Sequence, residues 1–282
     1  MKQYNEVLKR IMGEGDDRQT RNGMTRAMFA LQMRFNMADG FPAVTTKKLA
    51  FNAVKSELLW FLAMKKDRAS DKKLKEMLGS DRTIWTDNAE AEYWKPKAKF
   101  PGDLGRIYGV QWRHWRVAGP QRPATYVDQI ATVIHLLKTN PYDRRLVVSA
   151  WNPGDLKDMA LPPCHMMFQF FVSKGKLSLH MVQRSCDMFL GVPFNIASYS
   201  LLLHIVAQVT NMEPGECVLT LNDAHVYHDH FDAVKEQLSR EPMALPQLWL
   251  NPEIKDIDNF TMEDIRLENY VSHPAIKAKM AV

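Results

Sequence analysis

Hydrophobic positions recur at helical spacing in several stretches of the chain. In residues 51–64 (FNAVKSELLWFLAM) and 126–140 (YVDQIATVIHLLKTN) apolar side chains return every three or four positions, which predicts amphipathic helices. Residues 1–15 carry the same pattern in a more polar form, without the apolar core of a signal peptide. Residues 195–212 are apolar almost all round, so we expect a long helix buried at the centre of the fold.

In residues 165–183 apolar and polar side chains alternate instead of recurring at helical spacing. The segment HMMFQFFVSKGKLSLHMVQ shows this alternation on both sides of Lys174-Gly175, which predicts a β-hairpin that turns there. A β-branched run after Arg144 and Arg145 predicts another strand, with both arginines at its entrance. Neighbouring side chains of a strand point to opposite faces, so one ligand would not use both guanidiniums of a single chain. Either one arginine is structural or another subunit is involved.

The remaining segments indicate one α/β domain without a linker. Residues 93–109 and 116–126 contain scattered Pro and Gly and are interpreted as surface insertions. Residues 65–82 mix lysine with acidic residues at helical spacing, which is typical of a solvated helix face. The chain of 282 residues shows no repeat and no low-complexity tract, and its length suffices for a large core.

Composition narrows the class of protein. With 46% hydrophobic and 24% charged residues, and no apolar segment of membrane-spanning length, we expect a cytoplasmic protein. The three cysteines, Cys164, Cys186 and Cys217, show no CxxC or Cys/His metal spacing, which fits a reducing compartment and argues against structural zinc. The net charge of +5 favours anionic partners, and its sign alone does not separate nucleic acid from small phosphorylated molecules.

Cys164 lies in an unusual setting, the stretch MALPPCHMMFQFF (159–171). Pro162 and Pro163 exclude helix before the thiol and fix the backbone, so the sulfur can face a ligand with little loss of entropy. A core thiol is the simplest alternative, since free cysteine is usually a small buried hydrophobe. A nucleophilic thiolate requires nearby positive charge, which Arg184 in VQRSCD (182–187) could supply.

A histidine cluster offers two other interpretations. The segment LNDAHVYHDH (221–230) contains His225, Tyr227, His228 and His230, but no acidic or cysteine partner stands at the right helical offset for a metal site. A papain-like Cys/His hydrolase is a second possibility that spacing alone does not exclude. Neither alternative accounts for the arginines at both 144–145 and 184.

Seven motifs together carry a family resemblance. In chain order they are DGFPAVTTKK, ELLWF, DRRLVVSAW, WNPGDLKDMALPPCH, QRSCDMFLGVPFNIASY, DAHVY and HPAIKAKMAV. By these motifs, from near residue 30 to the last residue, the chain resembles the thymidylate synthase family, which also contains dCMP hydroxymethylases. The resemblance implies one α/β (α+β) domain over residues 1–282, with a large twisted mixed sheet flanked by helices, and a homodimer that packs sheet against sheet.

The resemblance also implies a reaction. The Cys164 thiolate would add to C6 of the uracil in dUMP, which turns C5 into a carbon nucleophile. That carbon would take a methylene group and then a hydride from 5,10-methylenetetrahydrofolate, giving dTMP and dihydrofolate without a metal.

Site residues follow from the resemblance motif by motif. Asn195 would read the base, because an amide can donate to O4 and accept from N3–H, whereas a carboxylate there would suit cytosine. Glu57, His165 and Tyr108 would handle protons at O4 and C5. The catalytic set is therefore Cys164, Glu57, Tyr108, His165, Arg184, Asp187 and Asn195.

The two ligands would be held by further side chains. For dUMP the set includes Gln183, Asp187 and Asn195. Its phosphate would be bound by Arg21, Arg184 and Ser185, together with Arg144 and Arg145 from the partner. Its ribose would contact His225 and Tyr227. For the folate it comprises Lys47, Trp85, Asp187, Leu190, Gly191, Phe194 and the C-terminal Val282 as a lid. Cys186 and Cys217 are expected to be core thiols.

Departures from the family pattern lie near phosphate and folate. The loop RNGMTRAMF (21–29) is shorter than usual, Arg106 stands where proline is common, and Asn222 where glycine is common. Residues 89–102 form an insertion beside the folate cleft. These changes could admit water, so the alternative activity is dUMP hydroxymethylase, with tetrahydrofolate released. Trp85 and the C-terminal KMAV favour the dry, reductive reaction.

A hypothesis of another class is a catalytically silent RNA-binding regulator. The basic composition gives it slight support. A binding module would have no use for Cys164 in its Pro-Pro setting.

Overall fold

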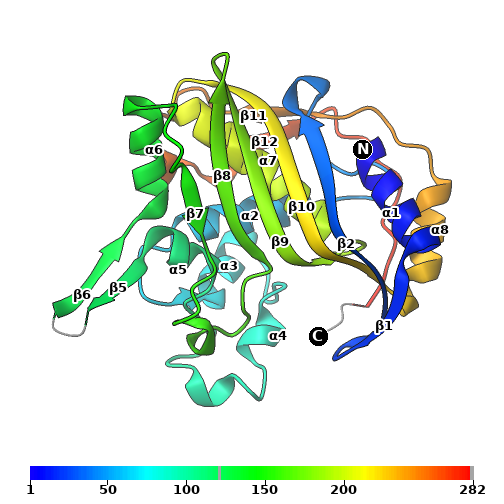
Figure 1. Ribbon diagram of the computed structural model, residues 1–282, viewed down its shortest axis with the longest axis horizontal. Helices are drawn as coiled ribbons and strands as arrows, with labels where there is room; N and C mark the ends of the chain where they lie inside the picture. The colour runs from blue at the N-terminus through cyan, green and yellow to red at the C-terminus, as the bar shows by residue number, and fades with distance from the viewer. Residues whose placement is uncertain (120–121, 280–282) are drawn as a thin grey trace.

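A six-stranded mixed sheet organises the molecule, in the order β1-β2-β10-β9-β8-β7 (Figure 1). The computed structural model describes residues 1–119 and 122–279. The strands are β1 (Asp16–Thr20), β2 (Gly23–Asn36), β3 (Ala69–Ser70), β4 (Asp103–Gly105), β5 (Trp115–Gly119), β6 (Arg122–Val127), β7 (Val147–Ser149), β8 (His165–Ser173), β9 (Lys176–Asp187), β10 (Glu213–Tyr227), β11 (Gln247–Leu250) and β12 (Ile265–Glu268). The helices are α1 (Lys2–Glu14), α2 (Phe51–Leu62), α3 (Asp71–Leu78), α4 (Thr86–Ala89), α5 (Tyr108–Arg113), α6 (Gln129–Thr139), α7 (Val192–Val209) and α8 (Phe231–Ser239).

The pairing of β9 with β10 is parallel, whereas the other neighbours in this sheet run antiparallel. Parallel neighbours need a crossover, and α7 provides it. Pro193 lies in the first turn of α7, where its missing N–H breaks no helical bond. The end of β9 and the start of α7 therefore meet at the same edge of the sheet.

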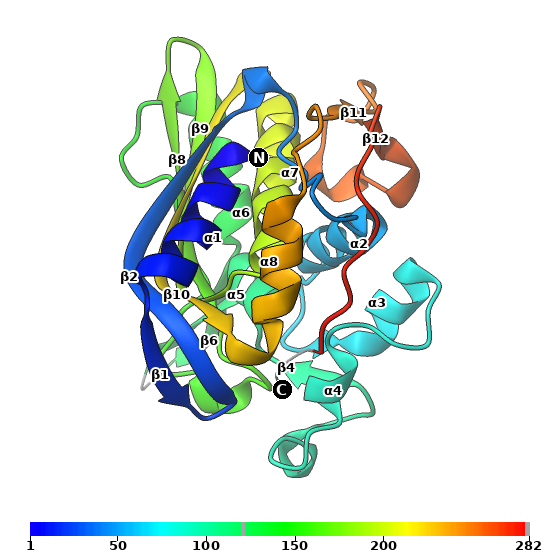
Figure 2. The same ribbon diagram turned by 90° about the vertical axis from the view of Figure 1, so that its right-hand side faces the viewer.

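The helices lie on one side of the sheet. Figure 2 shows α1, α8, α7, α6 and α2 on that side, and no helix of the described chain covers the opposite face. In β8, Phe168 and Phe170 are buried, whereas Phe171, the residue after Phe170, is 65% exposed. This alternation gives β8 one core face and one open face.

Most of the predicted elements are confirmed. Helices lie at 2–14, 51–62, 129–139 and 192–209, and β8 and β9 form the expected hairpin. Both turn residues, Lys174 and Gly175, have positive φ, at 51° and 74°. Helix α6 begins after Asp128, whose carboxylate accepts a hydrogen bond from Ala131 N at 2.9 Å.

The prediction of a surface insertion over 93–109 is wrong. Trp94 is 0% exposed and its indole N–H donates to the carbonyl of Asp103 at 2.6 Å. Residues 116–126 belong largely to the projecting hairpin β5–β6 rather than to a loop (Figure 1). Of the lysine-rich stretch 65–82, only residues 71–78 are helical, in α3.

Arg144 and Arg145 lie in a turn before β7, and the strand itself begins at Val147. The argument that they point to opposite faces of a strand is therefore wrong, because they are not in one. Both are exposed, and Arg145 forms an ion pair with Asp143 at 3.0 Å.

The expectation that no segment has membrane-spanning length is wrong for α7, which is the one helix of the described residues that is long and apolar enough to cross a membrane. In this fold 72% of that stretch is buried inside the protein. Cys186 and Cys217 are also fully buried, so their interpretation as core thiols is confirmed.

Strand β4 lies tightly against the chain that leads to Cys164. Gly105 forms a bridge with Met159, and its φ of +73° favours glycine. A Cβ on Gly105 would lie 2.0 Å from the carbonyl oxygen of Asp158. Only glycine therefore permits this approach.

Replacing Gly105 by alanine should destabilise the protein strongly. Gly175 is the matched control, because its φ is +74° and a Cβ there meets nothing within 4 Å. We expect Gly175→Ala to lower the free energy of unfolding by about 1–2 kcal/mol. Gly105→Ala should lower it by at least ~2 kcal/mol more, because backbone must move. Urea unfolding measures both, and equal losses would contradict the steric argument.

Candidate active site

The backbone of Cys164 is fixed by hydrogen bonds from two directions. Its N–H donates to the hydroxyl of Tyr108 at 2.7 Å, and its carbonyl accepts from the backbone N–H of Arg184 at 2.8 Å. Cys164 directly precedes β8 and is partly exposed. The thiol therefore sits at a strand end, on a segment with little freedom.

The Arg184 side chain holds the two residues before the thiol. Its guanidinium donates to the carbonyls of Pro163 and Pro162, at 2.9 and 3.0 Å, and lies 5.4 Å from the ring of Trp151. Prolines lack an N–H, so this segment cannot enter a regular ladder, and a side chain satisfies its carbonyls instead.

Burial outweighs positive charge at the thiol. Desolvation raises the pKa of Cys164, while the charge of Arg184 and the hydrogen bond with Tyr108 act in the opposite direction. Arg184 thus supplies the positive charge expected from the sequence, but burial outweighs it and favours the thiol over the thiolate. Formation of the thiolate therefore requires a proton acceptor.

A hydrogen-bonded chain runs beside the thiol from β9 through α7 to β8. Asn195 donates from Nδ2 to Nε2 of His165 at 2.9 Å, and Tyr199 lies 3.2 Å from Nδ1 of the same ring. Burial lowers the pKa of His165 to about 3, so the ring is neutral. Because Nε2 accepts, Nδ1 carries the proton and donates to Tyr199.

The amide of Asn195 is fixed on its other side as well. Nε2 of Gln183 donates to Oδ1 of Asn195 at 3.1 Å and to the carbonyl of Ser185 at 3.0 Å. Asn195 thus retains one N–H and one lone pair in a fixed orientation. Such a pair complements a ring that presents a carbonyl next to an N–H.

The carboxyl group of Glu57 has a pKa near neutral pH. Its Oε1 accepts from the indole N–H of Trp85 at 2.6 Å. Burial raises the pKa of Glu57 to about 7, although the hydrogen bond from Trp85 acts in the opposite direction. The ring of Trp85 packs edge-on against Tyr108, with centroids 5.7 Å apart, so this carboxyl is linked to the thiol through two aromatic rings.

Asp187 shapes the turn between β9 and α7. Its Oδ1 accepts from the backbone N–H groups of Phe189 and Leu190, at 3.0 and 2.9 Å. Gly191 follows with an N–H bond to the Asp187 carbonyl at 3.1 Å. Phe194, one turn into α7, is partly exposed.

Lys47 lies inside the protein. It is 6% exposed, its ammonium donates to the carbonyl of Phe189, and Nζ is 3.6 Å from the centre of the Phe189 ring. Burial lowers the pKa of Lys47 to about 8, which the charge of Asp187 partly offsets. In this structure the ammonium therefore stabilises the turn that Asp187 shapes.

The histidines of the 221–230 segment each have a separate partner. Nδ1 of His225 lies 3.2 Å from Oδ1 of Asp223, and its ring stands perpendicular to Tyr227 with centroids 5.2 Å apart. His228 contacts Asp17 at 3.0 Å, and His230 the carbonyl of Lys279 at 2.7 Å. Within residues 1–119 and 122–279, no group of three or more His, Cys, Asp or Glu could hold a metal ion.

Several predicted residues lie outside this cluster. Arg21 is exposed at the β1–β2 turn and donates to the side chain of Asn22 at 2.9 Å. Arg144 and Arg145 lie before β7, as described above. Val282 lies outside the described residues.

Two residues of the site were missed in the sequence. Tyr199 stands four residues after Asn195, and this helical spacing places both on one face of α7, so the signal existed. Trp151 is separated from Arg184 by more than thirty residues of chain, and no pattern connects the two.

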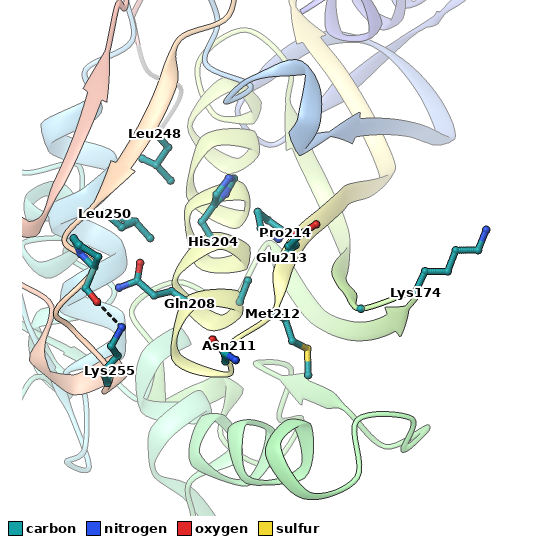
Figure 3. A pocket seen from close by; sticks show the side chains of 13 residues that line it. Lys174, His204, Gln208, Asn211, Met212, Glu213, Pro214, Leu248, Leu250 and Lys255 are labelled. Carbon is teal, nitrogen blue, oxygen red and sulfur yellow. Dashed lines mark hydrogen bonds between the residues drawn. The ribbon is translucent and has the colours of Figure 1, made fainter.

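A cavity of about 610 Å³ lies near the C-terminal end of α7, away from Cys164 (Figure 3). His204 and Gln208 line it from α7, Asn211 from the turn that follows, and Leu248 and Leu250 from β11. None of the residues around Cys164 contributes to it.

The cluster around Cys164 combines a thiol, the neutral imidazole of His165, the fixed amide of Asn195 and the carboxyl group of Glu57, whose pKa is about 7. This set suits addition of sulfur to a polarised carbonyl-containing ring, followed by proton transfer. Residues 2–282 match the sequence profile of the family described as thymidylate synthase. The match spans essentially the whole chain and includes every residue of the cluster, so the chain belongs to the thymidylate synthase family of one-carbon transfer enzymes.

Proposed function

We propose that the protein methylates dUMP to dTMP, with 5,10-methylenetetrahydrofolate as carbon donor and reductant. The observation that carries this proposal is the amide of Asn195, held between Gln183 and His165 beside the thiol. Its free N–H and lone pair match O4 and N3–H of uracil, whereas cytosine presents a donor at position 4.

Cys164 would attack C6 of uracil, and the electron density would move to C5 and O4. Glu57 is suited to proton transfer there, because a carboxyl group with a pKa of about 7 both gives and takes protons near neutral pH. C5 would then form a bond to the methylene group of the folate. Loss of the C5 proton and of the folate amine would leave an exocyclic methylene on the ring. Hydride transfer from the resulting tetrahydrofolate would convert this methylene to the methyl group as Cys164 leaves C6, giving dTMP and dihydrofolate.

Arginines would neutralise the phosphate of dUMP. Arg184 is next to the thiol, and Arg21 and Ser185 would join it, with Arg144 and Arg145 supplied by the partner of a homodimer. His225 and Tyr227 would bind the ribose hydroxyl. The open face of the sheet, with exposed Phe171, supports association through that face.

The folate would lie against Trp85, Leu190, Gly191 and Phe194, with Asp187 and Lys47 at its edge and Val282 closing the cleft. A cytoplasmic location would keep the essential thiol reduced. A second activity, hydroxymethylation of dUMP by water, rests on the insertion 89–102. Tyr93 of that insertion donates to the carbonyl of Ala160 at 2.7 Å, close in sequence to the thiol.

The product distinguishes the two activities. Mass spectrometry of the nucleotide formed from dUMP and methylenetetrahydrofolate should show dTMP, with dihydrofolate as the second product. A product heavier by one oxygen, with tetrahydrofolate, would instead identify the hydroxymethylase.

We expect Cys164→Ser to lower turnover by at least about a thousandfold, because the hydroxyl is a much weaker nucleophile. Cys217→Ala is the control and should retain turnover.

Glu57→Gln should abolish proton transfer yet stabilise the protein at alkaline pH. In the folded state the Glu57 pKa of about 7 exceeds the ordinary 4.5, so the folded protein holds more protons between these values and its stability falls as pH rises through this window. The variant lacks this loss. At pH 8 its unfolding free energy should exceed that of wild type by about 1–3 kcal/mol, with no gain at pH 4.

Urea unfolding at both pH values measures the difference. Glu6→Gln, on the exposed side of α1, serves as the control and should give a constant difference. A Glu57→Gln difference that does not change with pH would contradict the buried carboxyl.

Phe171→Asp should dissociate the proposed dimer, because it places a charge on the open face of the sheet. Sedimentation velocity of the wild type should give the dimer mass and that of the variant the monomer mass. Phe100→Asp, at an exposed aromatic in the loop before β4, should leave the dimer intact. A wild type that sediments as a monomer would rule out the shared phosphate site.

A further inference from the structure

Arg106 is a buried cation that joins separate parts of the chain. Its side chain is 1% exposed. The guanidinium contacts Asp155 at 2.7 Å and Asp67 at 2.6 Å, and donates to the carbonyl of His114 at 2.8 Å. The turn after α2, the end of α5 and the loop after β7 are thereby fixed to one side chain.

The charges of this cluster balance. Arg116 lies 3.6 Å from Asp67 and 3.9 Å from Asp155, which gives two cations and two carboxylates. The ring of His114 lies 3.7 Å from Asp67, and burial lowers its pKa, so it adds no charge near neutral pH. Amide groups of Gln111 and Asn152 complete the shell of Asp155, at 2.9 and 3.1 Å.

Arg106 and Asp155 are buried, whereas Asp67 is 50% exposed and Arg116 35%. A buried ion pair gives little net stability compared with apolar side chains of the same volume, and a half-exposed pair gives little because solvent screens it. Stability alone therefore does not account for Arg106. What the cluster provides is geometry, because a guanidinium with several partners has one permitted position.

The backbone around Arg106 connects the cluster to the thiol. Its N–H donates to the carbonyl of Asp158 at 3.0 Å, and the carbonyl of Leu104, two residues earlier, accepts from the N–H of Ala160 at 3.0 Å. Two residues after Arg106, Tyr108 begins α5 with φ of +23°, a conformation that needs external support. The Tyr108 hydroxyl then accepts the N–H of Cys164.

We propose that Arg106 is a positioning residue, which holds the Tyr108 hydroxyl against Cys164 and so tunes the thiol. It acts through Tyr108 and the 158–160 segment and touches no reacting atom. The inference rests on the proposed function for the identity of the electrophile, but the state of the thiol can be measured without any substrate.

The test is the pH dependence of Cys164 alkylation by iodoacetamide, followed by peptide mass mapping. Besides accepting the backbone N–H of Cys164, the Tyr108 hydroxyl acts on the thiol itself and lowers its pKa, so a displaced hydroxyl should raise the apparent thiol pKa. In Arg106→Met we expect the midpoint to move to higher pH, with alkylation at pH 8 slowed about threefold to tenfold relative to its own alkaline plateau. In turnover, kcat should fall about tenfold while KM for dUMP changes less than twofold.

Arg113 provides the matched control. It is also 1% exposed, lies at the other end of α5, and pairs with Asp128 and Asp258 at 2.9 and 2.8 Å. Arg113→Met should lower the unfolding free energy as much as Arg106→Met but leave the midpoint unshifted. Should the arginine variants fail to fold, Asp67→Asn and Asp258→Asn form a milder pair, of which only the first should move the midpoint.

An unshifted midpoint in both Arg106→Met and Asp67→Asn would overturn the proposal, and so would equal shifts in the control variants. If the midpoint shifts in these variants but the wild type forms no dTMP, the positioning role is supported and the proposed function is refuted.

Discussion

The short segment from Pro162 to Cys164 is the constraint on which the site depends. Two prolines remove the donors that would tie this segment into a sheet, so its carbonyls depend on the guanidinium of Arg184. Arg184 belongs to β9, and the hairpin pairing of β8 with β9 sets Gln183 directly opposite His165. The register of one hairpin thus aligns the thiol, the imidazole and the residue that orients Asn195.

Enclosure has the same effect on three groups of different chemistry. Burial raises the pKa of Cys164 and Glu57 and lowers that of His165, so each tends toward its uncharged form. An uncharged, enclosed site makes each remaining dipole more effective, because little solvent screens it. A ligand that brings its own charge would therefore change the protonation of the site more than it would at a solvated surface.

Much of the fold was predictable from local pattern. Helical spacing indicated α1, α2, α6 and α7, and alternation indicated the β8–β9 hairpin together with its turn. These elements are long and periodic, so their patterns are strong. The motif resemblance likewise gathered the residues around Cys164, which come from separate elements.

The predictions were wrong where tertiary packing, rather than local sequence, determines the structure. Residues 93–109 contain the Pro and Gly of a loop, but Trp94 fills the core, and no local pattern distinguishes a buried loop from an exposed one. The strand expected at Arg144 begins only at Val147, because the pairing with β8 ends there. The elevated pKa of Cys164 depends on how much protein surrounds the sulfur, which the sequence does not express.

The sheet order has a consequence for synthesis on the ribosome. Strand β2 finds its inner neighbour only in β10, so that Phe35 pairs with Cys217. At typical rates of translation, roughly 10 to 40 s separate the appearance of these two residues. During this interval the fourteen-residue strand β2 has only β1 beside it, with one edge unpaired. The nascent chain must therefore keep this edge from aggregating until nearly four-fifths of the protein has been made.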